Sequence, residues 1–473
     1  MAGPQESGGR FDLVVIGAGP GGYIGAIRAS QLGLRTALIE KDAELGGTCL
    51  LRGCIPTKAL LQSAAMHHTL QHAGEFGFKI SGVQLDFPAV QKRKAAIVER
   101  LSKGVAFLMK KNRVQVFEGT GKIDGPFRVS VASRSGRSQI LEAKNILLAT
   151  GSEAKGLPGI EPDGKKILTS DHALELSAVP KSIIILGAGA VGVEFASIFS
   201  SFGTQVTVVE LLPRAVPGED EEISKELERC FKKRGITVRT GVKVQKASPS
   251  AKGVEVILTS GEGGKPETLS AEFLLLGVGR RPKSDGLGLE KTKVIVEKGF
   301  VRTDAVYRTA EPGLWAIGDL VGRAPLAHVA SHEAVAAAEA MAGGEPHPIN
   351  YDQVPWCTYC DPEVARVGLT EKQAQERGHS VKSGKFPFSV LGRAQILGET
   401  EGFVKIVTDQ KYGEVLGVHI IGPKATELVA EGAALLALEA TTESIVATLH
   451  AHPSLSEAVG EAALDVLGRA LNR

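Results

Sequence analysis

The stretch GGTCLLRGCIPTK, residues 46–58, places Cys49 and Cys54 five positions apart. Five residues of a regular helix advance about 7.5 Å along its axis, whereas a disulfide requires Cα atoms no more than about 7 Å apart. If the two cysteines pair, the segment must be an irregular turn or a distorted helix start. Gly53 between them and Pro56 after them favour such an irregularity.

The residues that follow, TKALLQSAAM, predict a helix whose N-terminus points at the two thiols. The partial positive charge of a helix start lowers a thiol pKa and favours the thiolate, and Lys58 adds charge nearby. Two inert buried thiols are the alternative. The elements around the pair decide between these interpretations.

A glycine motif precedes the cysteines in FDLVVIGAGPGGYIGAIRASQLGLRTALIEK, residues 11–41. An apolar run predicts a buried strand, three glycines follow, and an Ala-rich stretch predicts a helix. Gly17 permits a tight turn, Gly19 lets a pyrophosphate approach the backbone, and Gly22 lets the helix pack on the strand. Glu40, eighteen residues after Gly22, is placed to accept hydrogen bonds from a ribose.

The same pattern returns in KSIIILGAGAVGVEFASIFSSFGTQVTVVE, where the acid is Glu210 and the glycines are Gly187, Gly189 and Gly192. One such motif is weak evidence, but two copies with the same flanks predict two dinucleotide sites. Glu210 repels a 2′-phosphate, and Arg214 is the only nearby residue that could grip one. The second nucleotide is therefore predicted to be NAD rather than NADP.

Two bound dinucleotides point to hydride transfer between a nicotinamide and a flavin. Cys49 and Cys54 then become a third redox centre. Apolar runs at 145–152, 273–282 and 314–320 each predict a strand that enters a glycine turn. Asp319, at the end of the last run, is placed to bind a sugar hydroxyl, and a turn or helix-capping acid is the alternative.

Length and composition limit the classes of protein that the chain can belong to. The 473 residues suffice for about three domains, and 43 % of them are hydrophobic. The 55 basic and 53 acidic residues nearly cancel, so we expect neither a nucleic-acid partner nor an acidic membrane surface. The N-terminus shows no signal or transit pattern, no apolar run is long enough to span a membrane, and five cysteines are too few for a disulfide scaffold. We expect a cytoplasmic protein.

GGTCLLRGCIPTK, the two glycine motifs, ATGS, AIGDL and HAHPSLSE together resemble the flavin-dependent pyridine nucleotide–disulfide oxidoreductases over nearly the whole chain. Within that family the chain is most similar to members that oxidise dihydrolipoamide. Leu51 and Arg52 depart from the family's usual Asn-Val between the cysteines. The departure leaves both cysteines in place.

The resemblance implies roles for individual residues. Cys49 would exchange with substrate, and Cys54 would lie against the flavin. Lys58 would sit near the reactive flavin nitrogen, paired with Glu194. Further family positions imply contacts to FAD at Gly121, Thr150, Asp319 and Ala327, and to NAD at Val244 and Gly279.

The C-terminal segment LHAHPSLSEAVGEAAL supplies a base. Attack of a substrate thiol on a disulfide needs a proton acceptor, and histidine suits that task near pH 7. The resemblance makes His452 this base and Glu457 the carboxylate that orients it. Without the resemblance, His450 and His452 would ordinarily be interpreted as surface histidines or as an incidental metal-binding pair.

A second pair, Cys357 and Cys360, could be a redox or metal pair. Zinc would need two further ligands, and no second pair is evident. Positions i and i+3 of an extended segment face opposite sides, which hinders a disulfide. We therefore predict two structural cysteines and no metal site.

The predicted fold is α/β, with two Rossmann-like domains for FAD and NAD and a C-terminal α+β dimerisation domain. The boundaries are 1–151 for the first part of the FAD domain, 152–279 for the NAD domain, 280–350 for the second part of the FAD domain, and 351–473 for the dimerisation domain.

The resemblance implies a homodimer that oxidises protein-bound dihydrolipoamide with NAD through a Cys49–Cys54 disulfide and FAD. Its partners would be lipoyl groups on an acyltransferase of a 2-oxoacid dehydrogenase complex or on a glycine-cleavage carrier protein. A glutathione-type reductase is disfavoured by Glu210, and a mercuric reductase by the lack of cysteines beyond Cys360. A non-catalytic scaffold is disfavoured by the intact cysteines, Lys58 and the His452–Glu457 pair.

Overall fold

The computed structural model of the chain describes residues 7–261 and 264–472. Within them the chain forms two compact units, each built from three separate stretches of sequence. The first unit comprises the residues up to Ala59, Ala89–Lys155 and Arg280–Tyr351. The second unit comprises Leu60–Pro88, Gly156–Gly279 and the residues from Asp352 onward.

The first unit is built on a seven-stranded sheet with the strand order β3-β2-β1-β6-β5-β4, and β19 also pairs with β6. Strands β3, β2, β1, β6 and β19 pair in parallel, whereas β5 and β4 form an antiparallel extension. The strands are β1 Ser7–Ile16, β2 Thr36–Glu40, β3 Gln115–Glu118, β4 Thr120–Gly125, β5 Arg128–Ala132, β6 Ser138–Leu148 and β19 Leu314–Ala316.

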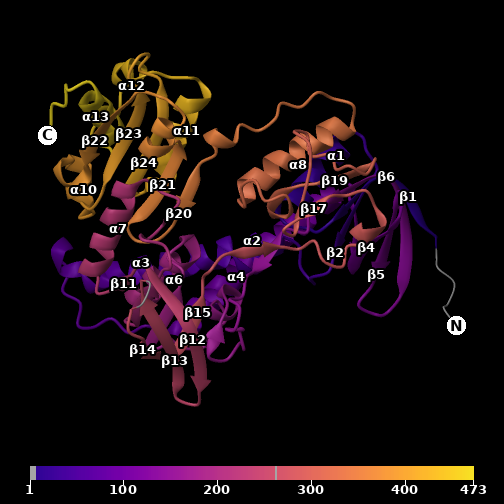
Figure 1. Cartoon of the computed structure of the whole chain (residues 1–473), viewed down its shortest axis with the longest axis horizontal. Coiled ribbons are helices and arrows are strands. Elements are labelled where there is room, and N and C mark those ends of the chain that lie inside the picture. Colours follow the sequence, from indigo (N-terminus) through magenta and orange to yellow (C-terminus); the bar gives the residue numbers. More distant parts are fainter. Residues whose placement is uncertain (1–6, 262–263, 473) are drawn as a thin grey trace. The chain divides into compact units, whose positions relative to one another are not determined.

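Two helices of the first unit, α1 (Pro20–Gln31) and α8 (Ala327–Met341), pack side by side (Figure 1). Small residues permit the close approach, since a Cβ on Gly25 would lie 3.1 Å from the Leu147 side chain and 3.3 Å from Ala334 Cβ. The packing fixes the start of α1 at the end of β1, where the first glycine motif lies.

Other elements complete this unit. They include α2 (Gly47–Arg52), the short strands β7 (Ser152–Ala154), β16 (Arg280–Pro282), β17 (Val296–Glu297) and β18 (Phe300–Val301), and the 3-10 turns η2 (Leu289–Lys291), η3 (Gly318–Leu320) and η4 (Tyr351–Gln353). Helices α3 (Cys54–Gln71) and α4 (Phe87–Lys111) each have residues assigned to both units, and η1 (Ala73–Phe76) lies between them in sequence.

The second unit contains a parallel sheet with the order β11-β10-β9-β15-β8 and an antiparallel sheet β12-β13-β14. The apolar run before the second glycine motif forms β9, and its Ile183, Ile184, Ile185 and Leu186 are buried. The elements are β8 Ile167–Leu168, α5 Ser170–Ala173, β9 Ser182–Leu186, α6 Ala190–Ser201, β10 Gln205–Val209, α7 Glu221–Lys233, β11 Thr237–Arg239, β12 Val242–Ser250, β13 Gly253–Ser260, β14 Glu267–Ala271 and β15 Phe273–Leu276.

The C-terminal part of this unit is a five-stranded antiparallel sheet with the order β20-β21-β24-β23-β22. Helices α11 and α13 pack on it, and α7 contacts β24 (Figure 1). Every residue of β23 and β24 is buried. The elements are β20 Trp356–Thr358, β21 Glu363–Gly368, α9 Glu371–Glu376, β22 Val381–Pro387, η5 Phe388–Val390, α10 Gly392–Leu397, β23 Phe403–Asp409, β24 Val415–Gly422, α11 Ala425–Ala437, α12 Thr442–Ala447 and α13 Glu457–Val466.

The predicted fold class is confirmed. Each glycine motif joins a buried parallel strand to a helix, and the C-terminal region combines an antiparallel sheet with helices. The segments FVKIVTD and VLGVHII form β23 and β24 of this sheet.

Candidate active site

The first glycine motif forms the turn between β1 and α1. Gly17 has a φ of 103°, and a Cβ added there would lie 2.5 Å from Ala149 O. A Cβ on Gly22 would lie 1.8 Å from Gly17 O, so the start of the helix packs directly on the turn. Gly19 is the N-cap of α1 and has no side chain to block the approach to the helix start. This turn fits a pyrophosphate held at the helix N-terminus.

Glu40, the last residue of β2, is oriented by the backbone of the same turn. Its Oε2 accepts a hydrogen bond of 2.7 Å from Ala18 N, and its Oε1 accepts one of 2.9 Å from Asp42 N. The carboxylate is buried, yet each oxygen retains a lone pair for a further donor. The arrangement fits the hydroxyl groups of a ribose.

The other positions predicted to contact FAD also lie in the first unit, with Gly121 in β4, Thr150 after β6, Asp319 in η3 and Ala327 at the start of α8. A Cβ on Gly121 would lie 3.1 Å from the Ile16 side chain, which explains the glycine. Asp319 accepts a hydrogen bond from the Ser152 hydroxyl, and Arg280 Nε lies 3.9 Å from its carboxylate.

Glu333 was missed by sequence reasoning. It lies on α8, is 1 % exposed, and accepts hydrogen bonds from Gly318 N at 2.5 Å and from the Tyr351 hydroxyl at 2.6 Å. Burial raises the pKa of its carboxyl, while the two hydrogen bonds oppose that rise. Glu333 therefore fixes the turn that carries Asp319, and its sequence signal is weak, since it is one of two acids in an Ala-rich helix.

The cysteine segment breaks between its two thiols, as predicted. Cys49 lies in α2, Cys54 begins α3, and Gly53 between them has φ −140° and ψ −109°. A Cβ on Gly53 would lie 2.9 Å from Thr48 O, so a side chain there would force the turn to open. Both cysteines are in the thiol form, and a hydrogen bond joins them.

The thiol chemistry of Cys49 differs from the prediction of a lowered pKa. The hydrogen bond with Cys54 and burial raise the pKa of Cys49, and the nearby charge of Lys58 opposes the rise without reversing it. The helix-start argument was wrong for this thiol because a neighbouring sulfur and partial desolvation outweigh one cation. In the dithiol state Cys49 is a neutral thiol.

The cysteine segment lies against the first glycine turn. Gly46 N donates a hydrogen bond of 3.0 Å to Ala18 O, and a Cβ on Gly47 would lie 2.5 Å from Gly19 Cα. Gly46 and Gly47 have φ values of 127° and 59°. These left-handed conformations let the backbone approach closely, so α2 starts beside the turn that fits a pyrophosphate.

The second glycine motif repeats this geometry. Gly187 has a φ of 97°, and a Cβ on Gly192 would lie 1.8 Å from Gly187 O. Glu210 accepts hydrogen bonds from Ala188 N at 2.6 Å and from Leu212 N at 2.8 Å. An added Cβ on Gly189, the N-cap of α6, would meet nothing within 4 Å. A second dinucleotide fits this turn as the first fits its own.

Arg214, the basic residue near Glu210 in the sequence that is the candidate to grip a 2′-phosphate, is already engaged in other contacts. Its guanidinium lies 3.0 Å from Glu221 Oε1 and donates to the carbonyl oxygens of Pro217 and Glu219. These contacts hold it toward the start of α7, which fits a nucleotide without that phosphate.

Three other predicted site residues also lie in the second unit. Val244 is half-buried in β12, and Gly279, with φ 105°, follows β15. Glu194 is buried on α6, where its carboxylate accepts a hydrogen bond of 2.9 Å from Tyr359 N.

The C-terminal histidine and its predicted partner are in contact. His452 Nδ1 lies 2.8 Å from Glu457 Oε1, and the side chain of His452 is 80 % exposed. Glu457 Oε2 also accepts a hydrogen bond from Ser454 N. Partial burial acts to raise the pKa of Glu457, but the bonds from Ser454 and His452 bring it below its usual range. With Nδ1 donating to a carboxylate, Nε2 is the atom that can accept a proton.

A second histidine–carboxylate pair lies beside the first and was not predicted. His450 Nε2 lies 2.7 Å from Glu431 Oε1, a residue of α11. A Cβ on Gly460 of α13 would lie 3.1 Å from His450 Nδ1, so His450 is wedged between the two helices. The pair anchors the segment that carries His452.

Cys357 and Cys360 are in the thiol form, and Cys360 is buried with its thiol directed at Pro362 O. Burial raises the pKa of Cys360 well above its usual value. Among the described residues no group of three His, Cys, Asp or Glu side chains could hold a metal ion. No helix of the described chain is long and apolar enough to cross a membrane.

The chain is similar to known proteins over nearly its whole length. The family described as pyridine nucleotide-disulphide oxidoreductase matches residues 11–334, and its dimerisation domain matches residues 354–463. The dihydrolipoyl dehydrogenase of Bacillus subtilis is 46 % identical over 98 % of this chain and 99 % of its own length. That of Chlorobaculum tepidum is 46 % identical over 97 % of both. The crystal structure of LpdA from Mycobacterium tuberculosis superimposes with a TM-score of 0.88 at 29 % identity, covering 96 % of this chain and 98 % of that one.

Proposed function

Because this chain belongs to the pyridine nucleotide-disulphide oxidoreductase family, we propose that it oxidises dihydrolipoyl groups to lipoyl groups with NAD. The observation that carries the proposal is the hydrogen-bonded pair Cys49 and Cys54 beside a dinucleotide turn, in a chain that also holds a histidine–carboxylate pair. Curated relatives at 46 % identity carry that activity in their names.

FAD and NAD are the cofactors of the proposed reaction. FAD would be held by the first turn and Glu40, with Gly121, Thr150, Asp319 and Ala327 around it, and NAD by the second turn and Glu210, with Val244 and Gly279. When bound, FAD would accept two electrons from the Cys49–Cys54 dithiol and deliver them as a hydride to NAD⁺.

The thiol steps are assigned to residues of this chain. In the oxidised enzyme Cys49 and Cys54 form a disulfide. His452 Nε2 takes a proton from the first substrate thiol, and the thiolate attacks Cys49 Sγ, so that the substrate–Cys49 bond forms while Cys54 leaves as a thiolate. The second substrate thiol then displaces Cys49, which leaves oxidised lipoyl and the reduced pair.

Glu457 keeps the His452 ring in the tautomer that can accept this proton and stabilises the imidazolium that results. In the reduced pair a thiolate at Cys54 would accept the hydrogen bond of the Cys49 thiol, which agrees with the raised pKa of Cys49. The charge of Lys58, near the start of α3, acts to lower the pKa of Cys49, and it is proposed to favour the Cys54 thiolate in the same way. Its partnership with Glu194 is part of the same proposal.

The boundaries at residues 151, 279 and 350 are proposed to separate the FAD, NAD, FAD and dimerisation segments. The chain carries the family's dimerisation domain, and the active form is proposed to be a homodimer whose sites each combine Cys49 of one chain with His452 of the other. Its partners are lipoyl groups on an acyltransferase or on a glycine-cleavage carrier protein, in the cytoplasm.

The test is NAD⁺ reduction by the FAD-loaded protein with dihydrolipoamide as electron donor. We expect activity with this pair and much less with NADPH and glutathione disulfide. Cys49→Ser should abolish turnover, whereas Cys230→Ser, at a buried cysteine of α7, is the matched control and should retain it. Turnover that survives in Cys49→Ser would overturn the proposed chemistry.

A further inference from the structure

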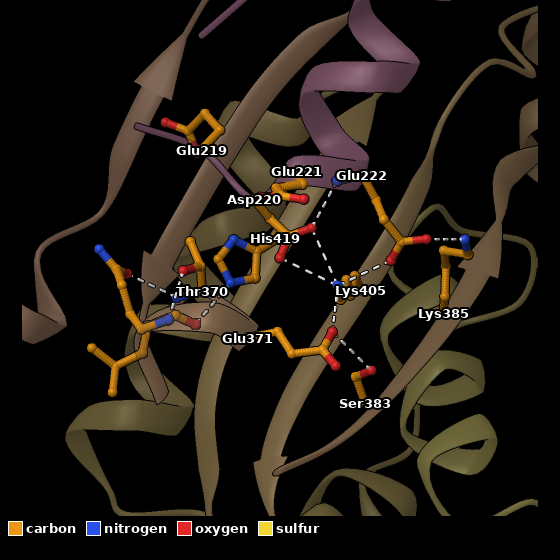
Figure 2. Close-up of polar contacts among 12 residues, drawn as sticks. Glu219, Asp220, Glu221, Glu222, Thr370, Glu371, Ser383, Lys385, Lys405 and His419 are labelled. Atoms are coloured by element: carbon orange, nitrogen blue, oxygen red, sulfur yellow. Dashed lines mark hydrogen bonds and ion pairs between the residues drawn. The ribbon is translucent and has the colours of Figure 1, made fainter. Parts of the chain in front are cut away.

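A cluster of charged side chains, centred on the buried Lys405 and Asp220, joins helix α7 to the C-terminal sheet (Figure 2). At its centre is Lys405 of β23, whose side chain is 4 % exposed. The ammonium lies 3.2 Å from both oxygens of Asp220. It also lies 3.0 Å from Glu222 and 2.8 Å from Glu371. Lys385 of β22 adds a second cation 2.6 Å from Glu222.

The geometry of the cluster is closely defined, because a buried charged group is stable in only a few arrangements of its partners. Burial acts to lower the pKa of Lys405, but its bonds to Glu371 and Glu222 raise that pKa well above its usual value. Removing one partner of such a group leaves an uncompensated charge, which is far more costly than the pair is favourable. The start of α7 can therefore occupy few positions on this sheet.

Two further titratable groups flank the cluster. Glu219 is buried, with its Oε2 3.1 Å from Arg366 Nε of β21, an ion pair without a well-aligned hydrogen bond. His419 of β24 donates from Nε2 to Leu369 O at 2.9 Å, so its buried Nδ1 carries no proton. The segment before α7 thus contacts the sheet through β21 and β23, and α7 itself contacts β24.

The same segment is attached to the second dinucleotide turn. Glu219 N donates to Val216 O at 2.9 Å, and Val216 N donates to Ala188 O at 2.8 Å. Ala188 N in turn donates to Glu210, the acid assigned to the ribose. Asp220, besides binding Lys405, caps α7 by accepting from Glu222 N at 3.0 Å.

We propose that the Lys405 cluster is a positioning device for NAD, which holds the 211–219 segment so that Glu210 and the second glycine turn keep the geometry that binds the ribose. Lys405 and Glu222 are positioning residues, since neither is assigned a contact to the nucleotide. The inference rests on the proposed NAD-dependent function and adds to it a dependence of NAD affinity on the C-terminal sheet.

The experiment compares Lys405→Met and Glu222→Gln with the wild type as FAD-loaded enzymes. Lys382→Met, at an exposed lysine of β22, is the matched control. The dissociation constant of NADH and the KM for NAD⁺ should rise about 5-fold or more in both cluster variants, the scale of a modest coupling between sites. The kcat, and the reduction of bound flavin by dihydrolipoamide without NAD⁺, should stay within about twofold of wild type.

The possible outcomes distinguish the proposed NAD-dependent function from the positioning role of the Lys405 cluster. A wild-type enzyme that does not bind or reduce NAD would refute the proposed function itself. A wild type that does, alongside folded variants with lower thermal stability but unchanged NADH affinity, would show that the cluster is merely structural and would overturn this inference. If Lys405→Met does not fold, Glu222→Gln decides alone, because its carboxylate is the more exposed partner at 41 %.

Discussion

The buried carboxyl of Glu219 should make the stability of this protein depend on pH in a calculable way. Burial raises the pKa of Glu219 to about 7 from 4.5, against the opposing charge of Arg366. A raised pKa means that the folded state holds the proton more tightly. The stability that this group contributes is therefore complete below about pH 4.5 and is lost as the pH rises through about 7.

The size of the effect follows from linkage. Between pH 5 and pH 8 a group with these two pKa values loses about 2.5 kcal/mol of stabilisation. For 473 residues the entropy of unfolding is about 1 kcal/mol/K, so the loss corresponds to about 2.5 °C in Tm. Glu219→Gln removes the titration, so the Tm of the wild type minus that of the variant should fall by about this amount across the range.

The assay is thermal unfolding of both proteins at equal concentration with saturating FAD, from pH 5 to pH 8. Burial lowers the pKa of His419 to about 4, so its contribution is lost as the pH falls from about 6.5. The contribution of His419 is the same in the wild type and in Glu219→Gln, so it cancels in the difference between their Tm values. Glu255→Gln, at an exposed carboxylate of β13, controls for the loss of one acid. A difference that stays constant with pH would refute the argument for Glu219.

Three further predictions concern the chemistry. Glu457→Gln should lower kcat with dihydrolipoamide by about 10²-fold or more, because His452 loses its orienting carboxylate, whereas reduction of the flavin by NADH should stay intact. An equal loss of flavin reduction by dihydrolipoamide and by NADH would contradict this role. Refolding Cys54→Ser together with His452→Gln should restore about a quarter of full activity by counting sites in random dimers, and no recovery with mixed dimers present would exclude a shared site. Glu221→Gln should release Arg214 and raise kcat/KM for NADP⁺ relative to NAD⁺, whereas an unchanged ratio would show that Arg214 does not bear on the choice.

Much of the fold and of the site follows from local sequence because local chemistry fixes it. The spacing of the glycines and the terminal acid specifies a strand, a tight turn and a helix, and the structure forms both copies with the acid bound to the turn. The His452–Glu457 contact also spans only five residues. Such features depend on backbone geometry that neighbouring residues determine.

The remaining features depend on residues that only tertiary packing brings together. Lys405 stands in the strand FVKIVTD, where a lone lysine would ordinarily face solvent, and its partners Asp220 and Glu371 lie 185 and 34 residues away. Glu333 is one acid among alanines until α8 packs against the turn it holds. The raised pKa of Cys49 likewise follows from the sulfur that the broken helix places beside it. No periodicity or spacing in the sequence encodes these contacts.

After each of the two glycine motifs the backbone follows a similar path, but the two paths carry different side chains. In each half the chain passes the acid and returns to the glycine turn six residues later, where Gly46 N binds Ala18 O and Val216 N binds Ala188 O. Nine residues after the acid the first copy carries Cys49, and the second carries Glu219.

The two copies differ after the backbone hydrogen bond that returns each chain to its glycine turn. After Gly46 the first copy continues through a second left-handed glycine, and α2, which carries Cys49, starts against the turn that is proposed to bind FAD. The second copy continues into a carboxylate run that α7 and the C-terminal sheet bury around Lys405. The shared return fixes where each segment starts, and the residues after it decide whether that segment presents the cysteine pair or the carboxylates around Lys405.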